Sequence, residues 1–166
     1  MIPRTIVVNV ALGILILVFA GSLYSKELDG SSRIKITGNV AEGVSKRITV
    51  KEIESTGISE AELFDPFDKK KSSFTGVMLT EFVKKFGKQA VTRVIFTAVD
   101  DYEITFTQSE WNTERILLVT RIENKYFDLE QRGPLRIVYP DYDPKKDDSK
   151  EVMPKWIWMI KTINLQ

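Results

Sequence analysis

Hydrophobic and polar residues follow two different periodicities beyond residue 32. Ile34 and Ile36 alternate with polar neighbours, which is the period-two pattern of a half-buried strand. Residues Met78–Phe86 instead carry apolar side chains at positions i, i+3, i+4 and i+7, which predicts an amphipathic helix followed by Gly87 as its cap. The apolar positions of that helix are Leu79, Phe82, Val83 and Phe86.

Capping and turn residues place the remaining elements. Thr49–Ser55 is expected to form a short helix, with Thr49 as its cap, Glu52 at the capping-box position and Gly57 after its end. Thr107–Trp111 is expected to form one helical turn capped by Thr107. Strands are expected at Ile58–Phe64, Arg93–Val99, Glu103–Thr107, Ile116–Glu123, Leu135–Tyr139 and Trp156–Asn164. Turns or loops are expected at Asp65–Ser73, Asp100–Tyr102, Glu123–Lys125 and Asp141–Glu151. The pattern predicts an α+β fold of mostly β mixed sheets with a few short helices.

The first residues form a separate apolar segment, expected to be a helix. Residues 6–24 contain one polar interruption, Asn9, and Arg4 precedes them. A signal peptide cleaved near Ala20–Ser22 and a membrane anchor of nearly the ~20 residues that span a bilayer are both open interpretations. A buried core helix is disfavoured because the segment has no polar face.

The domain boundaries follow from this segment. Residues 1–25 are the signal peptide or anchor, 26–32 a polar linker and 33–166 the folded domain. A positive charge ahead of the apolar segment stays on the cytoplasmic side, which predicts a periplasmic or otherwise extracytoplasmic domain. If residues 6–24 are not cleaved, they hold the protein in the membrane.

Composition excludes several kinds of site. The chain has 166 residues and no cysteine or histidine, which excludes disulfides, thiolate nucleophiles, Ser-His-Asp catalysis and Cys or His metal ligands. The net charge of +1 gives no field toward nucleic acid. In the acidic stretch Asp141–Glu151, Lys145 and Lys146 stand where a calcium loop needs a ligand and a glycine. No catalytic residue and no metal site is therefore assigned.

Three segments in fixed order resemble one protein family. They are Phe74–Val83 (FTGVMLTEFV), Thr97–Tyr102 (TAVDDY) and Gly133–Pro140 (GPLRIVYP), the last followed by Lys155-Trp156. Together they are similar to the sulfite-oxidase-like molybdopterin-binding domain, over about residues 33–166. The resemblance implies a sulfite-oxidase molybdopterin-domain-like fold, molybdopterin as cofactor and oxidoreductase activity.

The chain differs from that family in the residues that bind the metal and the cofactor. The family binds molybdenum through a cysteine upstream of the first segment, and the corresponding stretch Ile58–Ser73 has none. No other residue type supplies a soft, charged sulfur ligand. The loop before Lys155 carries aspartates where the family contacts phosphate, and these repel an anion. The resemblance thus implies the fold more than the redox activity, and no cofactor is predicted.

The candidate ligand-binding site lies around Arg136–Tyr139 and Lys155–Trp158, where the resemblance places a cleft. Its residues are Arg136, Tyr139, Tyr142, Lys155, Trp156 and Trp158. Two cations and several aromatic faces favour a small anion, with a carboxylate preferred to a nucleotide. Arg136 fits an anion contact and a structural ion pair equally. Trp156 and Trp158 share one strand face, either in the core or in a pocket wall.

Three functions fit these observations. The first is an exported, non-catalytic ligand-binding or sensing module for a small anionic ligand or a partner envelope protein. The second is a molybdopterin-dependent oxidoreductase that binds the cofactor without a cysteine ligand, which metal analysis would reveal. The third is a structural envelope protein, which predicts no concave pocket. Nucleic acid is not an expected partner of any of them.

Overall fold

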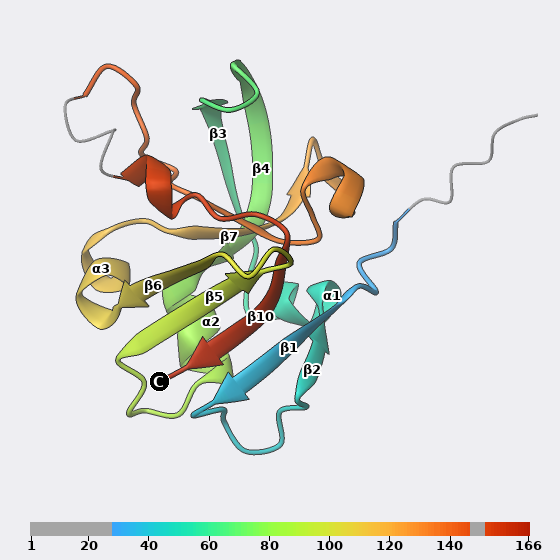
Figure 1. Ribbon diagram of the computed structural model, residues 1–166, viewed down its shortest axis with the longest axis vertical. Coiled ribbons are helices and arrows are strands. Elements are labelled where there is room, and N and C mark those ends of the chain that lie inside the picture. The colour runs from blue at the N-terminus through green and yellow to red at the C-terminus, as the bar shows by residue number, and fades with distance from the viewer. Residues whose placement is uncertain (1–27, 147–151) are drawn as a thin grey trace, which may run out of the picture.

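The computed structural model describes residues 28–146 and 152–166, in which two five-stranded sheets and short helices share one core (Figure 1). The first sheet has the order β2-β1-β10-β5-β6, with β1 Arg33–Gly38, β2 Arg47–Thr49, β5 Arg93–Ala98, β6 Glu103–Thr107 and β10 Ile160–Leu165. The second has the order β3-β4-β7-β8 with β9 beside β7, where β3 is Ser59–Asp65, β4 Lys70–Met78, β7 Leu117–Ile122, β8 Lys125–Tyr126 and β9 Arg136–Val138.

The helices are short and sit between these strands. They are α1 Val50–Glu54, α2 Leu79–Phe86 and α3 Gln108–Thr113, with the single-turn 3-10 helices η1 Leu129–Gln131 and η2 Met153–Lys155. The first sheet is mixed, because β1 runs parallel to β10 while its other pairs are antiparallel. The expected α+β class is confirmed, although only the first sheet is mixed and the second is antiparallel throughout. The first and last strands of the domain are neighbours, with Ile36 opposite Ile163. The first sheet is therefore complete only when both ends of the domain are present.

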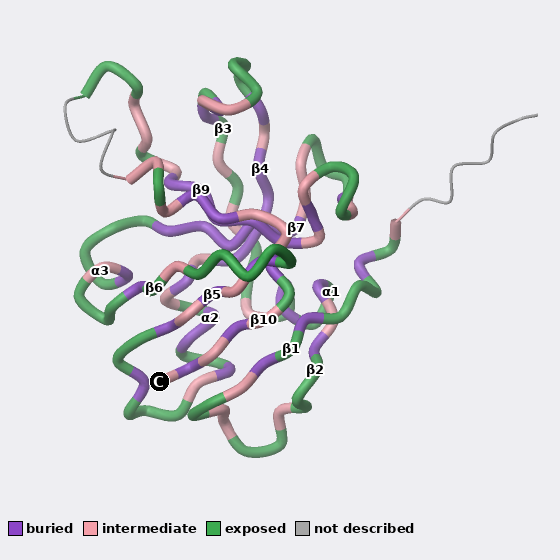
Figure 2. The backbone as a smooth tube through the Cα atoms, in the orientation of Figure 1, coloured by how far each residue is buried: buried purple, intermediate pink, exposed green. Residues whose placement is uncertain are grey.

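The predicted periodicities agree with burial. Ile34 and Ile36 are buried, as are all four apolar positions of α2, and Phe82 has no exposed surface. Figure 2 colours the buried residues purple, and these include positions on β1 and α2. The helix of Met78–Phe86 and its buried face are confirmed.

Both predicted helix caps are present. The Thr49 hydroxyl accepts the Glu52 N–H at 3.0 Å, and the Glu52 carboxylate accepts the Thr49 N–H at 2.6 Å. The same reciprocal pair joins Thr107 and Glu110 at the start of α3. Each box satisfies backbone donors that the first helical turn leaves free, so these short helices form where the sequence predicts them.

The hairpin turn at Glu123-Asn124 is also as expected, and its two residues have φ of 49° and 60°. Positive φ at both central positions matches the right-handed twist of the strands that the turn joins.

One strand prediction and one loop prediction are wrong. Trp156–Asn164 is not one alternating strand, because β10 begins only at Ile160 and Met159, with φ of 54°, interrupts extended backbone. As a result Trp156 and Ile157 are both buried, instead of lying on opposite faces. Asp65–Ser73 is not one loop, because β4 already starts at Lys70. Pairing with β3 draws these polar residues into the sheet, which their composition does not indicate.

The predicted targeting segment, residues 1–25, and most of the linker lie outside the described residues, as does part of the Asp141–Glu151 loop. Within the part that the structure describes, no helix is both long and apolar enough to cross a bilayer.

Candidate functional site

The turn between β3 and β4 is organised by one buried carboxylate. Asp65 Oδ1 accepts the backbone N–H groups of Phe67 at 2.8 Å and of Asp68 at 3.2 Å. An aspartate that bonds its own backbone in this way fixes the conformation of a turn. Lys69 completes the turn in the left-handed region, with φ of 53°. The turn therefore holds the Phe67 side chain at the tip of the hairpin.

The second oxygen of Asp65 is bonded to β9. Its Oδ2 accepts from Arg136 Nη2 at 2.9 Å, and both side chains are 1% exposed. The Arg136 guanidinium also lies over the rings of Phe74 and Trp156, 5.3 and 5.9 Å from their centroids. Burial lowers the pKa of Arg136, and the nearby carboxylate of Asp65 opposes that shift. Of the two roles open for Arg136, the structure shows the ion pair.

Four aromatic rings form a cluster at the hairpin tip. Phe67 contacts the Trp158 ring edge to face, with centroids 4.8 Å apart and planes at 79°, and the Trp156 ring at 5.9 Å. Tyr142 packs edge to face against the other side of the cluster, 5.2 Å from Trp156. Trp156 is only 2% exposed, whereas Trp158 and Phe67 are half-buried. The rings thus come from three separate parts of the chain.

The Phe67, Trp156 and Trp158 rings border a cavity of about 290 Å³, which we call the aromatic cavity. Its lining residues are Phe67, Ala98, Asp100, Tyr102, Met153, Pro154, Trp156, Ile157 and Trp158. Of these, Asp100 is the only charged one. The Tyr102 hydroxyl donates to the Pro154 carbonyl at 2.9 Å and so links the β5–β6 loop to η2. The indole Nε1 of Trp156 is buried and has no hydrogen-bond partner among the described residues.

The candidate residues divide into two groups around this cavity. Trp156 and Trp158 line it, and Tyr142 and Arg136 contact Trp156 without lining it. Lys155 is bonded instead to Glu110 of α3. Tyr139 is buried, burial raises the pKa of its phenol, and its hydroxyl has no partner among the described residues. The two cations on which the anion prediction rested are therefore already paired with carboxylates.

Sequence reasoning missed three important lining residues. The sequence predicts only a turn or loop around Phe67, and only a hairpin turn at Asp100 and Tyr102. A proline-aromatic pair inside a charged turn was the available signal for Phe67, because an apolar ring at a hairpin tip needs a surface to cover it.

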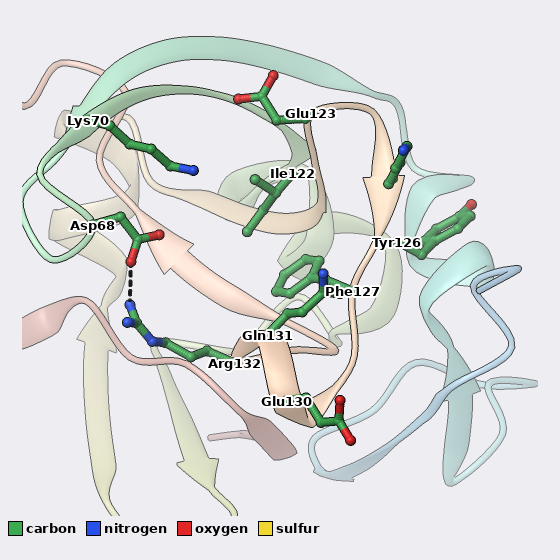
Figure 3. A pocket seen from close by; sticks show the side chains of 10 residues that line it. Asp68, Lys70, Ile122, Glu123, Tyr126, Phe127, Glu130, Gln131 and Arg132 are labelled. Carbon is green, nitrogen blue, oxygen red and sulfur yellow. Dashed lines mark hydrogen bonds and ion pairs between the residues drawn. The ribbon is translucent and has the colours of Figure 1, made fainter. Parts of the chain in front are cut away.

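A second cavity of about 370 Å³, which we call the charged groove, is lined by residues of the β3–β4 hairpin, of β7 and β8 and of η1 (Figure 3). In Figure 3 the Lys70 side chain extends over it, Ile122 and Phe127 are apolar residues of its wall, and Asp68 bonds Arg132 at 3.0 Å. Its lining carries three acidic and three basic side chains: Asp68, Glu123 and Glu130 against Lys70, Lys125 and Arg132. Balanced, mostly exposed charges select no particular ligand charge, so the aromatic cavity is the stronger candidate.

A buried polar cluster joins α1 to the second sheet. The carboxylate of Glu54 accepts from Thr120 Oγ1 at 2.7 Å, Tyr126 Oη at 2.7 Å and Arg121 Nε and Nη2 at 2.9 and 2.6 Å. The Arg121 guanidinium also lies 4.6 Å from the centroid of the Tyr126 ring. Burial by itself raises the pKa of Glu54, but the bonds from Arg121, Thr120 and Tyr126 outweigh it and lower the pKa below 4.5. Thr120, Arg121 and Tyr126 all donate to this carboxylate and so occupy its oxygens, which makes the cluster structural.

The Glu54 cluster predicts a pH dependence of stability. A carboxylate with a lowered folded-state pKa contributes stability that is complete above the unfolded pKa and is lost as pH falls through the folded pKa. We expect Glu54→Gln to destabilise the domain at pH 7, and the difference from wild type to shrink as pH falls below about 4.5. Urea unfolding between pH 7 and pH 3 measures it. A difference that stays constant over this range would contradict the assignment.

The residues present do not fit the cofactor that the sequence resemblance implies. The chain offers no sulfur or imidazole donor beyond methionine, and within the described residues no group of three acidic side chains lies together. The stretch that would carry the family's thiolate, Ile58–Ser73, instead carries Asp65, whose oxygens are bonded to Arg136 and to its own turn. A thiolate-bound molybdenum centre has no ligand here.

Comparison with known proteins supports the fold. No family model matches the chain, and no curated protein matches it. The structure is similar to the crystal structure of the sulfane dehydrogenase SoxCD from Paracoccus pantotrophus, with a TM-score of 0.55 and 13% sequence identity. The match covers 84% of this chain but only 39% of that one. At this identity the similarity shows a shared fold alone, and it supports the sulfite-oxidase-like fold as a distant match.

Proposed function

We propose that this chain is a non-catalytic ligand-binding module and that the aromatic cavity is its binding site. The observation that carries the proposal is the lining of the cavity, to which Phe67, Tyr102, Trp156 and Trp158 contribute aromatic rings. Aromatic side chains with a few polar groups are the usual lining of small-molecule sites. The cavity of about 290 Å³ therefore offers contact area to a small ligand.

The cavity lining favours binding over catalysis. Catalysis by a side-chain nucleophile needs a base within hydrogen-bond reach of it. The Tyr102 hydroxyl is bonded to a backbone carbonyl, and Lys155 is bonded to Glu110. Asp100 Oδ1 accepts the Tyr102 N–H, which is a turn contact and not a catalytic pair. The aromatic rings supply contact area and stacking surface, which are the properties of a recognition site.

The site assignment predicts where small ligands bind. In a fragment screen by ligand-observed NMR, hits on the full-length chain should lose most of their binding in Trp158→Leu and keep it in Lys70→Ala. Trp158 lines the aromatic cavity and Lys70 the charged groove, so the two variants separate the sites. A hit at 100 times its Kd should stabilise the wild type by ~2.7 kcal/mol. Hits lost in Lys70→Ala but retained in Trp158→Leu would place the binding site in the charged groove instead.

We also propose that the module works outside the cytoplasm, either periplasmic or otherwise extracytoplasmic, where a partner envelope protein is the alternative to a free ligand. Residues 6–24 and the preceding Arg4 support this proposal. Alkaline phosphatase fused after Gln166 should therefore be active. Green fluorescent protein fused at the same position should not fluoresce, because it would be exported unfolded. An inactive phosphatase with a fluorescent second fusion would contradict export.

A further inference from the structure

We infer that the aromatic cavity selects a small alkylated ammonium cation. This inference rests on the proposed function, since it names the ligand class of the same cavity. It also replaces the expected anion, because the structure pairs Arg136 with Asp65 and Lys155 with Glu110.

The walls of the cavity suit a cation because several of its lining residues are aromatic. Phe67, Tyr102, Trp156 and Trp158 all line it. Phe67 and Trp158 pack edge to face, with their ring planes at 79°. An ammonium group with methyl substituents is attracted to ring faces by their quadrupoles, and its methyl groups gain apolar contact there. A fully alkylated ammonium group has no N–H, so it loses no strong hydrogen bond to water when aromatic rings enclose it.

The local charges favour the same ligand. Arg136 and Arg132 lie over the Trp156 and Trp158 rings, but each is held by a carboxylate, Asp65 or Asp68. Asp100 is the only charged side chain among the lining residues and is exposed at the cavity. The nearby arginine–aspartate pairs cancel, so the remaining lining charge is negative and attracts a cation.

Size and hydrogen bonding narrow the ligand further. About 290 Å³ lies at the lower end of small-molecule sites, enough for a trimethylammonium head with a short substituent. The Asp100 carboxylate in the lining can accept a hydrogen bond from a hydroxyl group on that substituent. Choline has both features, and 3,3-dimethylbutan-1-ol has the same shape and hydroxyl without the charge.

The test compares these two probes on the full-length chain by tryptophan fluorescence and calorimetry. Choline should bind about tenfold more tightly than the neutral alcohol, the factor expected for a cation held against several rings. Trp158→Leu should abolish the choline response. Asp100→Asn should weaken choline several-fold and leave the alcohol unchanged. Asp101→Asn is the matched control, since Asp101 pairs with Lys161 and does not line the cavity.

The outcomes separate the inference from the proposal on which it rests. Equal or tighter binding of the alcohol would overturn the cation while supporting a ligand site in the cavity. A choline response that survives Trp158→Leu would show that choline does not bind in the aromatic cavity, and would overturn the inference. Binding of neither probe would also overturn the cation, and the fragment screen would then decide on its own whether the cavity binds ligands.

Discussion

Asp65→Ala is expected to destabilise the domain by about 3–5 kcal/mol, because it leaves the Arg136 guanidinium buried without its counter-charge. Both side chains are 1% exposed, so water cannot replace the lost partner. Arg136 Nε already lacks a partner among the described residues, and losing the bond from Nη2 would worsen that deficit. The same substitution removes the acceptor for the backbone N–H groups of Phe67 and Asp68.

Asp68→Ala is the matched control, three residues further along the same turn. Asp68 also pairs with an arginine, Arg132, but about a third of each of these side chains is exposed. Exposed pairs contribute about 0–1 kcal/mol, so the control should lose little. Urea unfolding of both variants measures the contrast. Similar losses in the two would show that burial of the Asp65–Arg136 pair is not what sets its importance.

Phe82→Ala is expected to cost about 3–5 kcal/mol, through lost apolar burial and the cavity left behind. Phe82 has no exposed surface and lies on the inner face of α2, 4.9 Å from the ring of Phe86. The ring fills space between the helix and the sheets, and the small side chain of alanine cannot close it.

Lys84→Ala tests the opposite face of the same helix. Its side chain is 77% exposed and only 4.0 Å from Glu81, a surface pair that contributes little. Its effect should stay within about 0.5 kcal/mol. Thermal and urea unfolding of the two variants give the comparison, and a small loss for Phe82→Ala would mean that α2 packs loosely on the core.

Local sequence signals predicted much of the secondary structure. The capping residues at Thr49 and Thr107 predicted α1 and α3, and apolar spacing predicted α2. These signals act within one or two turns of chain, so a single sequence contains all the information they need. The polar residues at the start of β4 do not predict a strand, because they are extended only through residue-by-residue pairing with β3.

The site depends on contacts between residues far apart in the chain. The resemblance directed attention to Trp156 and Trp158, and both line the aromatic cavity. The other aromatic residues of the lining come from the tip of the β3–β4 hairpin and from the β5–β6 loop. No periodicity along the sequence links Phe67 or Tyr102 to the tryptophans. Only the packing of the two sheets in the folded domain brings these segments together.

By itself, the sequence determined the α+β class, the capped helices and the absence of thiol and imidazole chemistry. Composition and short-range geometry suffice for such conclusions. The tertiary structure decided the charge of the site. Arg136 pairs with Asp65, 71 residues away, and Lys155 bonds Glu110, 45 residues away. Whether a charge is free to bind a ligand or is already neutralised depends on which residues folding places beside it, because electrostatic attraction in the interior acts over a few ångströms of space and not along the chain.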